Sequence, residues 1–511
     1  MTMSSLKKRA VAVSFIFKFP DGNVSRRPQV ALFRRSGEVN TYPHKRAPIS
    51  GSVDPQDSSP LATAWRELAE ETTLTASSLR LFRQGKPYSF TDLDVGREWT
   101  INPFAFILKS ARQGSAASEE GIKIDWEHEA FQWFDPDEIS DDEAFQGVPR
   151  LKESLRRVWF EIDLGKDAAD VLAAGLKALQ DDHVSGAREL AAKALDIYLD
   201  VIPRLETNDQ TSWWKNVRFA AWHLWKNGRE SMGAPILSVV LSSLDIIEKH
   251  LPTSSSLSNT LVEQICAAIK DFAKARQQSG TQIVATFASF LDHFPSDKPL
   301  KIITLSSSST ITSSLTHVFS SDSSTRPLDI HVLESRPLFE GVKVAQRLSS
   351  TIQLHANINA SITLHTDASA ALASQNAHIL LLGADLIDRS GNVSNKTGSL
   401  PAVLAARHVS PGVKTVVVAE KEKILPFDPP GHDEDNDAGE LVRSWGDVVG
   451  SASEGSDGEL RGVTVKNVYF EWVPATMVDV YLTEDGIEGT QDVERWAGEV
   501  RQKADRFFDD L

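Results

Sequence analysis

Hydrophobic positions along the chain change their spacing twice, and the two changes divide it into three parts. Short apolar runs broken by polar turns, typical of β-strands, occupy residues 1–160. Apolar residues then recur every three or four positions over residues 165–295, as on the buried faces of packed helices. Short apolar strands alternate with helices over residues 298–511. The pattern predicts a multidomain protein with these boundaries.

The first part is predicted to be an α+β domain with strands layered around one helix. That helix covers Pro60–Thr73, and a proline in the first turn costs no hydrogen bond because its N–H would have no partner there. Strands are expected at Ala10–Phe19, Val30–Arg35, Ala47–Val53, Leu79–Gln84, Glu98–Leu108 and Ala130–Phe134.

The second part is predicted to be a helical bundle. Its amphipathic segments are Ala168–Leu179, Gly186–Ile202, Trp213–Asn227, Ala234–Lys249 and Leu261–Gln277. Several tryptophans crowd the third segment, namely Trp213, Trp214, Trp222 and Trp225. We expect these rings to belong to a core or a subunit interface rather than to a ligand cage.

The third part is predicted to be a doubly wound, Rossmann-like α/β domain. Strands are expected at Lys301–Leu305, Leu328–Leu333, Ile362–His365, Ile379–Gly383, Val413–Ala419 and Gly462–Asn467, with helices between them such as Phe339–Leu354 and Ala368–Ser374. Strand–helix alternation indicates a parallel sheet, whose ligands bind beyond the carboxyl ends of the strands. An acidic run with glycines and serines, at 429–459, interrupts the alternation and is expected to be a mobile surface insertion.

Composition narrows the function classes. A net charge of −16 argues against direct binding of nucleic acid or anionic membranes. Cys266 is the single cysteine, so no intramolecular disulfide can form, which fits a reducing compartment. Lys18 interrupts the apolar run near the N-terminus and favours a strand over a signal peptide, and no apolar stretch is long enough to span a bilayer. We expect a cytoplasmic protein.

The clearest chemistry lies on the predicted helix, in Arg66-Glu67-Leu68-Ala69-Glu70-Glu71. Glu67 and Glu71 are four residues apart and share a face, and Glu70 is three residues after Glu67. Clustered carboxylates repel one another unless a cation compensates. Oxygen-only ligands of this kind suit Mg²⁺ or Mn²⁺.

This segment resembles the Nudix box, in which a glycine, an acid and Arg-Glu-aliphatic-x-Glu-Glu follow at set spacings. Gly51 is followed by five residues and then Asp57, and eight further residues separate Asp57 from Arg66. The chain departs from the family pattern by an aspartate for glutamate, by one extra loop residue and by Thr73 in place of the last glycine.

The resemblance implies hydrolysis of a nucleoside diphosphate linked to another group. Glu67, Glu70 and Glu71 would hold the metal, Arg66 would orient the carboxylates, and Asp57 would assist.

Two further sets of residues in the first part each have two alternative roles. Glu127 and Glu129 could act as a ligand or base, against the alternative of exposed loop charge. A base could stack on Tyr42, Tyr88 or Trp99, against the alternative that these rings are core.

Polar residues follow several strands of the third part: Ser306–Ser309, Glu334–Pro337, Thr366-Asp367 and Gly383–Asp385, with Asn395–Gly398 and Thr483–Gly486 further on. Their order resembles the superfamily that joins the regulatory subunits of translation initiation factor 2B to methylthioribose-1-phosphate and ribose-1,5-bisphosphate isomerases. The resemblance covers residues 165–500.

In these isomerases an aspartate and a cysteine move protons on a sugar phosphate. The aspartate corresponds to Asp385 and the cysteine to Ser306, whereas Cys266 does not match either position. A serine hydroxyl is a poor proton carrier at neutral pH, and Ser185 replaces a family arginine, so isomerase activity is disfavoured.

Phosphate binding is better supported than catalysis, because serines ahead of a helix expected near Thr310 offer an anion site. The alternative is that these polar residues only stabilise the loops and pair with Asp385. The candidate phosphate-binding residues are Ser306, Ser307, Ser308, Arg336, Asn395 and Lys396.

Three functions are therefore open. The leading one is a Nudix-type hydrolase fused to a sugar-phosphate-binding or regulatory domain. The second is a non-catalytic assembly protein related to initiation factor 2B. The third is a sugar-phosphate isomerase that uses Asp385 and Ser306. Relatives of the third part pair through their sheet domains, so the resemblance implies at least a homodimer.

Overall fold

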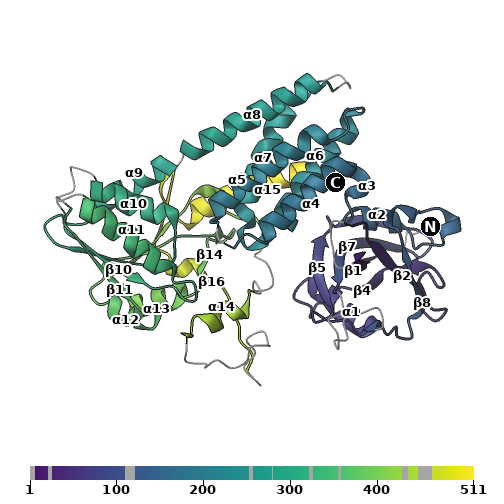
Figure 1. Cartoon of the computed structure of the whole chain (residues 1–511), viewed down its shortest axis with the longest axis horizontal. Helices are drawn as coiled ribbons and strands as arrows, with labels where there is room; N and C mark the ends of the chain where they lie inside the picture. The colour runs from purple at the N-terminus through teal and green to yellow at the C-terminus, as the bar shows by residue number, and fades with distance from the viewer. Residues whose placement is uncertain are drawn as a thin grey trace.

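The computed structural model describes residues 6–20, 26–109, 121–183, 185–252, 257–278, 280–320, 326–354, 358–427, 436–446 and 463–511. The helical part lies between a strand-rich N-terminal part and a second part with a sheet (Figure 1). Among the described residues, no helix is long and apolar enough to cross a membrane.

The N-terminal part is a sheet covered on both faces by helices. Its strands are β1 (Lys7–Lys18), β2 (Gln29–Arg35), β3 (Arg46–Ala47), β4 (Ile49–Ser52), β5 (Leu79–Gln84), β6 (Tyr88–Asp92), β7 (Arg97–Leu108) and β8 (His128–Phe134). β1 runs parallel to β7, and the other pairings are antiparallel. α1 (Pro60–Thr72) packs Ala64 and Leu68 against one face of this sheet, and α2 (Leu151–Arg156) packs Leu155 against the other.

The layered α+β prediction for this part is confirmed, with two changes in its strands. The strand expected at Ala47–Val53 is two strands, β3 and β4, broken at Pro48 because proline has no N–H for the ladder. The edge strand β6 was not predicted from the sequence, since its exposed and half-buried positions alternate without a strong apolar run.

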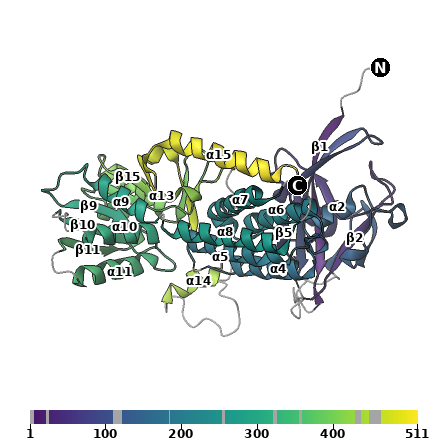
Figure 2. The ribbon, with the colours of Figure 1, turned by 90° about the horizontal axis from the view of Figure 1, so that it is seen from above.

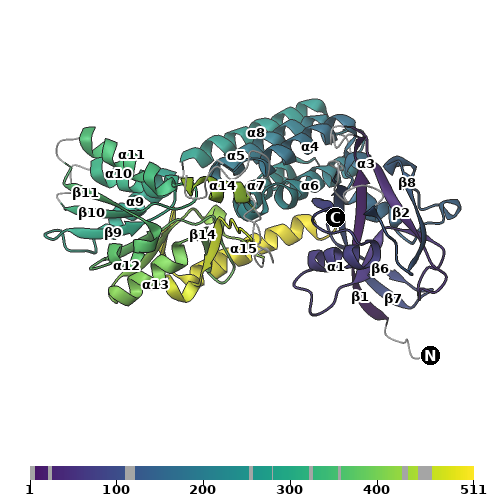
Figure 3. The same cartoon turned by 60° about the horizontal axis from the view of Figure 1, so that its bottom comes forward.

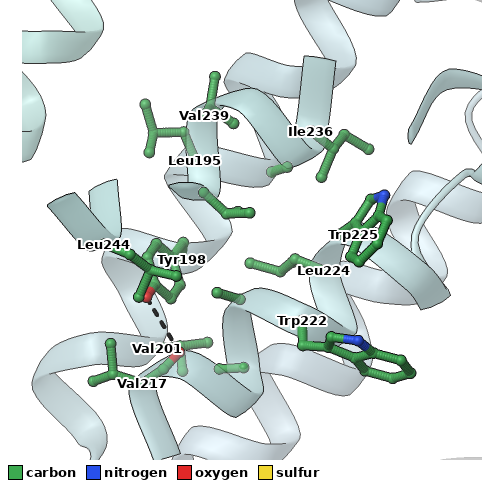
Figure 4. Packing of buried hydrophobic residues seen from close by; sticks show 14 of the residues in the cluster. Leu195, Tyr198, Val201, Val217, Trp222, Leu224, Trp225, Ile236, Val239 and Leu244 are labelled. Atoms are coloured by element: carbon green, nitrogen blue, oxygen red, sulfur yellow. Dashed lines mark hydrogen bonds between the residues drawn. The ribbon is translucent and has the colours of Figure 1, made fainter. Parts of the chain in front are cut away.

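The middle part is a bundle of helices: α3 (Glu161–Leu164), α4 (Lys166–Gln180), α5 (Ala187–Val201), α6 (Gln210–Asn227), α7 (Gly233–His250) and α8 (Asn259–Gln278). Figure 4 shows Tyr198, Trp222 and Trp225 among the buried aliphatic side chains, with the Tyr198 hydroxyl donating to the Val217 carbonyl at 3.2 Å. The prediction that the tryptophans form core is confirmed, because Trp213 is fully buried and Trp214 packs on Phe507.

The third part is built on a sheet in the order β11-β10-β9-β12-β15-β17-β18, parallel except for β18. The strands are β9 (Leu300–Thr304), β10 (Leu328–Leu333), β11 (Ala360–His365), β12 (Ile379–Leu382), β15 (Lys414–Val418), β17 (Val480–Thr483) and β18 (Gly486–Glu488). The helices are α9 (Gly280–Leu291), α10 (Ser309–Ser320), α11 (Glu340–Leu354), α12 (Ala370–Ala373) and α13 (Ser399–Val409). The strand order reverses between β9 and β12, which is where such sheets bind ligands.

One strand prediction in this part is wrong. Residues 463–467 form no strand, and Val463 is exposed. The strand lies later, at β16 (Phe470–Val473), which pairs with β14 (Val393–Lys396) in a small sheet that also contains β13 (Leu386–Ile387). Alternating valines without a partner strand do not make a ladder, so the pairing with β14 decides the position.

Two helices in this part were not predicted from the pattern. Within the acidic run 429–459 the structure describes residues 436–446, which include α14 (Ala438–Arg443); the remainder lies outside the described residues. The last helix, α15 (Thr490–Phe508), starts beside the sheet and buries Phe507 and Phe508 in the helical core. Figures 2 and 3 both show α15 running from the third part to the edge of the first.

Candidate functional site

Helix α1 carries the acidic motif and is fixed at both ends. The Ser59 hydroxyl caps its start by accepting from the Ala62 N–H at 3.2 Å. Thr73 ends it with a left-handed backbone at φ +61°, where the family pattern places glycine. A threonine in this conformation is strained, yet its hydroxyl donates to the Gly121 carbonyl at 3.2 Å.

Arg66 joins three of the predicted acids. Its guanidinium donates to Asp57 Oδ2 at 3.0 Å, to Glu67 Oε1 at 2.7 Å and to Glu70 Oε2 at 3.1 Å. The hydrogen bond from Arg66 holds the pKa of Asp57 below its usual value, and the same bonds raise the pKa of Arg66. Asp57 also accepts from the Thr63 hydroxyl, so the aspartate fixes the extra-residue loop onto the helix.

Glu71 lies apart from this network, in the protein interior. It is 3% exposed, and its Oε2 is 2.5 Å from Nε2 of His128 on β8. Burial, followed by the neighbouring carboxylates of Glu127 and Glu67, raises the pKa of Glu71 to about 9. Burial lowers the pKa of His128 to about 4. Both shifts favour a neutral pair in which the Glu71 carboxyl donates to an unprotonated imidazole.

The Glu71–His128 pair should make the stability of the metal-free protein depend on pH. The folded state keeps the Glu71 proton up to pH 9, whereas the unfolded chain loses it near 4.5, so the free energy of unfolding should fall as pH rises from 6.5 to 9. Below 6.5 the unfolded chain also protonates His128, and the two contributions oppose each other. Urea denaturation in EDTA should show this slope in the wild type and a flatter one in Glu71→Gln. Equal slopes in both proteins would contradict the assignment, and Glu129→Gln is the control.

Gly51 lets the backbone of β4 lie directly against Glu67. A Cβ added at Gly51 would lie 1.9 Å from the Glu67 carboxyl carbon. No side chain fits there without displacing that carboxylate. The first glycine of the motif therefore positions its first glutamate.

A cavity of about 520 Å³ opens beside these residues. Glu67 and Arg66 line it from α1, and Glu127 lines it from the loop before β8, whereas Asp57, Glu70 and Glu71 are not among its lining residues. Its other walls carry three arginines and five aromatic rings, Arg9, Arg35, Arg97, Tyr42, Tyr88, Phe90, Trp99 and Trp126.

The three aromatic side chains with two alternative roles lie between the cavity and the core. Tyr42, Tyr88 and Trp99 line the cavity and also pack with the buried cluster under β1. The Tyr42 hydroxyl donates to Asp92 at 2.7 Å, and Trp99 is 7% exposed. Trp126 also lines the cavity and is 64% exposed.

Several residues of the cavity were missed from the sequence. Arg9, Arg35 and Arg97 come from three different strands, so no local motif joins them. The structure separates Glu127 from Glu129. Glu127 lines the cavity, and burial raises its pKa. Glu129 lies outside the cavity and pairs with Arg34 and His44. Arg35 lines the same cavity as Glu127, and its positive charge partly offsets the rise in the pKa of Glu71 and of Glu127.

The acids fit a hard divalent cation by their chemistry. Glu67, Glu71 and Glu127 offer only oxygen donors. Burial, together with the charges of Glu127 and Glu67, raises the pKa of Glu71, so a cation would stabilise the ionised cluster. Among the residues that the structure describes, no three His, Cys, Asp or Glu side chains already form a ligand set around a point.

A second group of polar residues gathers at the reversal point of the third part. Ser306, two residues after the end of β9, has φ +72°, and its N–H donates to Ser335 Oγ at 2.7 Å. The N–H groups of Ser335 and Arg336 each donate to the Asp367 carboxylate at 2.8 Å. The loops after β9, β10 and β11 are thereby joined. Ser308 packs beside Gly383 of the loop after β12.

The candidate phosphate-binding residues do not all face one point. Burial raises the pKa of Asp385, with Lys423 and Lys396 acting in the opposite direction. Lys396 is buried and pairs with Glu340 at 3.0 Å, while Asn395 donates to the Ser399 hydroxyl at 2.9 Å. Arg336 extends instead to the Ser444 carbonyl beside α14, and Ser307 is exposed.

Glu420 was not predicted from the sequence and joins the helical part to the sheet. It accepts from the Thr310 hydroxyl at 2.9 Å and lies 3.4 Å from Lys423 and 3.5 Å from Arg188. Although burial opposes ionisation, Lys423, Thr310 and Arg188 bring the pKa of Glu420 down to about 2. Arg188 lies three residues after Ser185, the position of the replaced family arginine, so this part of the helical bundle is close to the sheet domain.

Two family models match the chain. The initiation factor 2 subunit family matches residues 183–489, and the NUDIX domain matches residues 8–158. Methylthioribose-1-phosphate isomerase of Pseudomonas paraeruginosa is 30% identical over 179 residues, which cover 34% of this chain and 45% of the relative. The Paracoccidioides brasiliensis (strain Pb18) enzyme of the same name is 29% identical over 165 residues, or 30% and 42%. The chain thus spans less than half the length of these curated relatives.

Two solved structures are similar to part of the chain. Translation initiation factor eIF-2B of Pyrococcus horikoshii OT3 has a TM-score of 0.42 at 20% identity, covering 62% of this chain and 96% of that one. A chain of the eIF2B-beta2-delta2 complex from C. thermophilum has a TM-score of 0.48 at 16% identity, covering 67% and 98%.

Proposed function

Because the chain belongs to the initiation factor 2 subunit family and carries an N-terminal NUDIX domain, we propose that it is a divalent-metal-dependent diphosphate hydrolase joined to a sugar-phosphate-binding domain. The observation that supports the hydrolase best is the 520 Å³ cavity, where Glu67 and Arg66 meet cationic and aromatic walls. Arginines suit phosphates, and flat rings suit a nucleobase.

In the proposed reaction, water attacks one phosphorus and the P–O–P bond breaks, which gives two phosphate monoesters and, when both are dianions, releases two protons. Mg²⁺ or Mn²⁺, held by Glu67, Glu71 and Glu127 with Glu70 and Asp57 nearby, would neutralise the diphosphate and acidify the attacking water. Arg66 fixes the orientation of Glu67. Burial raises the pKa of Glu127, which makes its carboxylate a stronger proton acceptor.

Arg35 is expected to bind the diphosphate, because it lines the cavity close to the acids. Arg35→Gln should raise KM for ADP-ribose about tenfold, since a charge-assisted hydrogen bond is worth about 1.5–3 kcal/mol. Steady-state kinetics measure this. Arg34→Gln is the matched control, since Arg34 pairs with Glu129 at 3.0 Å outside the cavity. An equal KM in both variants would contradict the role of Arg35.

For the third part we propose a sugar-phosphate ligand held near Asp385 and Lys396, with Ser306–Ser308 presenting polar groups at the start of α10. The similarity to methylthioribose-1-phosphate isomerases favours this ligand class. Hydrolysis of a nucleoside diphosphate sugar releases a sugar phosphate, so one domain could supply the ligand of the other. Isomerisation through Asp385 is the second candidate, favoured by the raised pKa of that buried carboxyl but weakened by serine at position 306.

Ligand binding by this domain can be tested by thermal shift. Ribose 5-phosphate should raise the unfolding midpoint of the wild type and of Lys343→Met, an exposed control on α11, but not that of Lys396→Met. Equal shifts in all three proteins would exclude the Lys396 site. Turnover of ribose 1,5-bisphosphate that is abolished by Asp385→Asn would favour the isomerase.

We also propose that the chain forms at least a homodimer. Light scattering at micromolar concentration that gave the mass of one chain would contradict this. A purely assembling role would instead be supported by co-purification with initiation factor 2B subunits and by the absence of hydrolysis.

A further inference from the structure

Strand β6 is a thin wall between two cavities. Tyr88 and Phe90 line both the 520 Å³ cavity and a second cavity of about 320 Å³, which also touches Lys215 of α6 and residues Asp509–Leu511. In the described sheet β6 pairs with β7 alone. A strand with one ladder partner opens more easily than a central strand, so the position of Tyr88 depends on what supports the other side of β6.

The helical part holds the chain just ahead of β6. Asn227, at the end of α6, accepts from the Gln84 N–H at 2.6 Å and donates to the Gln84 carbonyl at 2.9 Å. Its side-chain amide thus completes both backbone hydrogen bonds of one residue, as a neighbouring strand would. Asn227 is 5% exposed, and its Nδ2 lies 2.8 Å from His223 Nδ1, so the amide is fixed within the bundle.

Arg157, directly after α2, holds the same segment from a second direction. Its guanidinium donates to the carbonyls of Lys86 at 3.0 Å and Leu511 at 3.1 Å, and to Glu153 at 2.9 Å. It lies 4.3 Å from the centroid of the Tyr88 ring. The backbone approaches closely here, because a Cβ on Gly85 would lie 2.9 Å from the Arg157 Cβ.

We propose that Asn227 and Arg157 are positioning residues for the hydrolase: they hold β6 and Tyr88 as the substrate-binding wall of a cavity that neither residue lines. This proposal rests on the proposed hydrolase function. The helical part, which follows the NUDIX domain in the chain, thereby sets the affinity of that domain for its substrate. The segment after α15 takes part through the contact between Leu511 and Arg157.

Full-length variants test this with two independent measurements. Asn227→Ala and Arg157→Gln should raise KM for ADP-ribose and Kd for ADP about tenfold each, with kcat within about twofold of wild type, because lost positioning weakens binding rather than chemistry. Hydrogen exchange at residues 87–92 should accelerate in the same variants. Arg157→Lys should restore part of the affinity. Asn216→Ala and Arg156→Gln are the matched controls. Each removes a hydrogen bond to Asp163 from α6 or α2 and leaves the contacts of β6 unchanged.

The outcomes separate the two proposals. Unchanged KM and unchanged exchange at 87–92 in folded Asn227→Ala and Arg157→Gln would overturn the positioning role. If Asn227→Ala does not fold, Asn227→Asp decides: it keeps the size of the side chain and the acceptor for the Gln84 N–H, removes the Nδ2 donor that serves the Gln84 carbonyl and His223, and adds a negative charge. A wild type without hydrolysis, combined with faster exchange in the variants, would refute the hydrolase and support the control of β6 by the bundle.

Discussion

Replacing Glu67 with glutamine should lower kcat for diphosphate hydrolysis at least about 100-fold, because several kcal/mol of charge stabilisation depend on the ionised acids and each 1.4 kcal/mol is tenfold. Glu67 is the one glutamate of α1 that lines the cavity, and it is held by Arg66 at 2.7 Å. Initial rates with ADP-ribose at saturating Mg²⁺ measure the effect.

Glu129→Gln is the control for Glu67→Gln. Both substitutions remove one carboxylate from the same domain, but Glu129 pairs with Arg34 and His44 outside the cavity. The kcat of Glu129→Gln should stay within about twofold of wild type, since exposed ion pairs contribute little to stability. Similar losses in the two variants would show that net charge, rather than the position of Glu67, governs the rate.

Gly51→Ala should inactivate the hydrolase almost as strongly as Glu67→Gln while leaving the fold intact. The new methyl group would lie 1.9 Å from the Glu67 carboxyl carbon, so the flexible end of that side chain has to move. Misplacing a catalytic group by about 1 Å can cost about 100-fold in rate. Kinetics and a thermal melt should therefore show a large loss of kcat with a small shift in midpoint.

Gly412→Ala is the matched control, since no atom lies within 4 Å of an added Cβ at that glycine. It should change neither kcat nor the melting midpoint by much. Wild-type activity in Gly51→Ala would show that Glu67 has room elsewhere and that its place against β4 is not required.

The sequence predicted those features that depend on local pattern. The Arg66–Glu71 helix, the buried tryptophans of α6 and the parallel sheet of the third part were all confirmed, because each follows from apolar spacing within one segment. Helix α15 carried a comparable signal, with Val493, Trp496 and Phe507 on one buried face, and could have been predicted.

Features that depend on long-range packing could not be predicted in the same way. The wall of the hydrolase cavity combines β6 with arginines from three strands, and its support comes from Asn227, which lies 143 residues after Gln84. The same holds for Glu420, whose partners lie in separate elements. Likewise, Glu67, Glu70 and Glu71 are equivalent in the motif, but only packing distinguishes the cavity-lining, exposed and buried carboxylates.

The most direct test of the hydrolase is product analysis with the full chain in H₂¹⁸O, using ADP-ribose with and without Mg²⁺. Metal-dependent hydrolysis predicts AMP and ribose 5-phosphate, with one ¹⁸O on one of the two phosphates, and little turnover in EDTA or with Glu67→Gln. Absence of turnover across a panel of nucleoside diphosphate sugars and dinucleotides, or turnover equal in Glu67→Gln, would contradict the account.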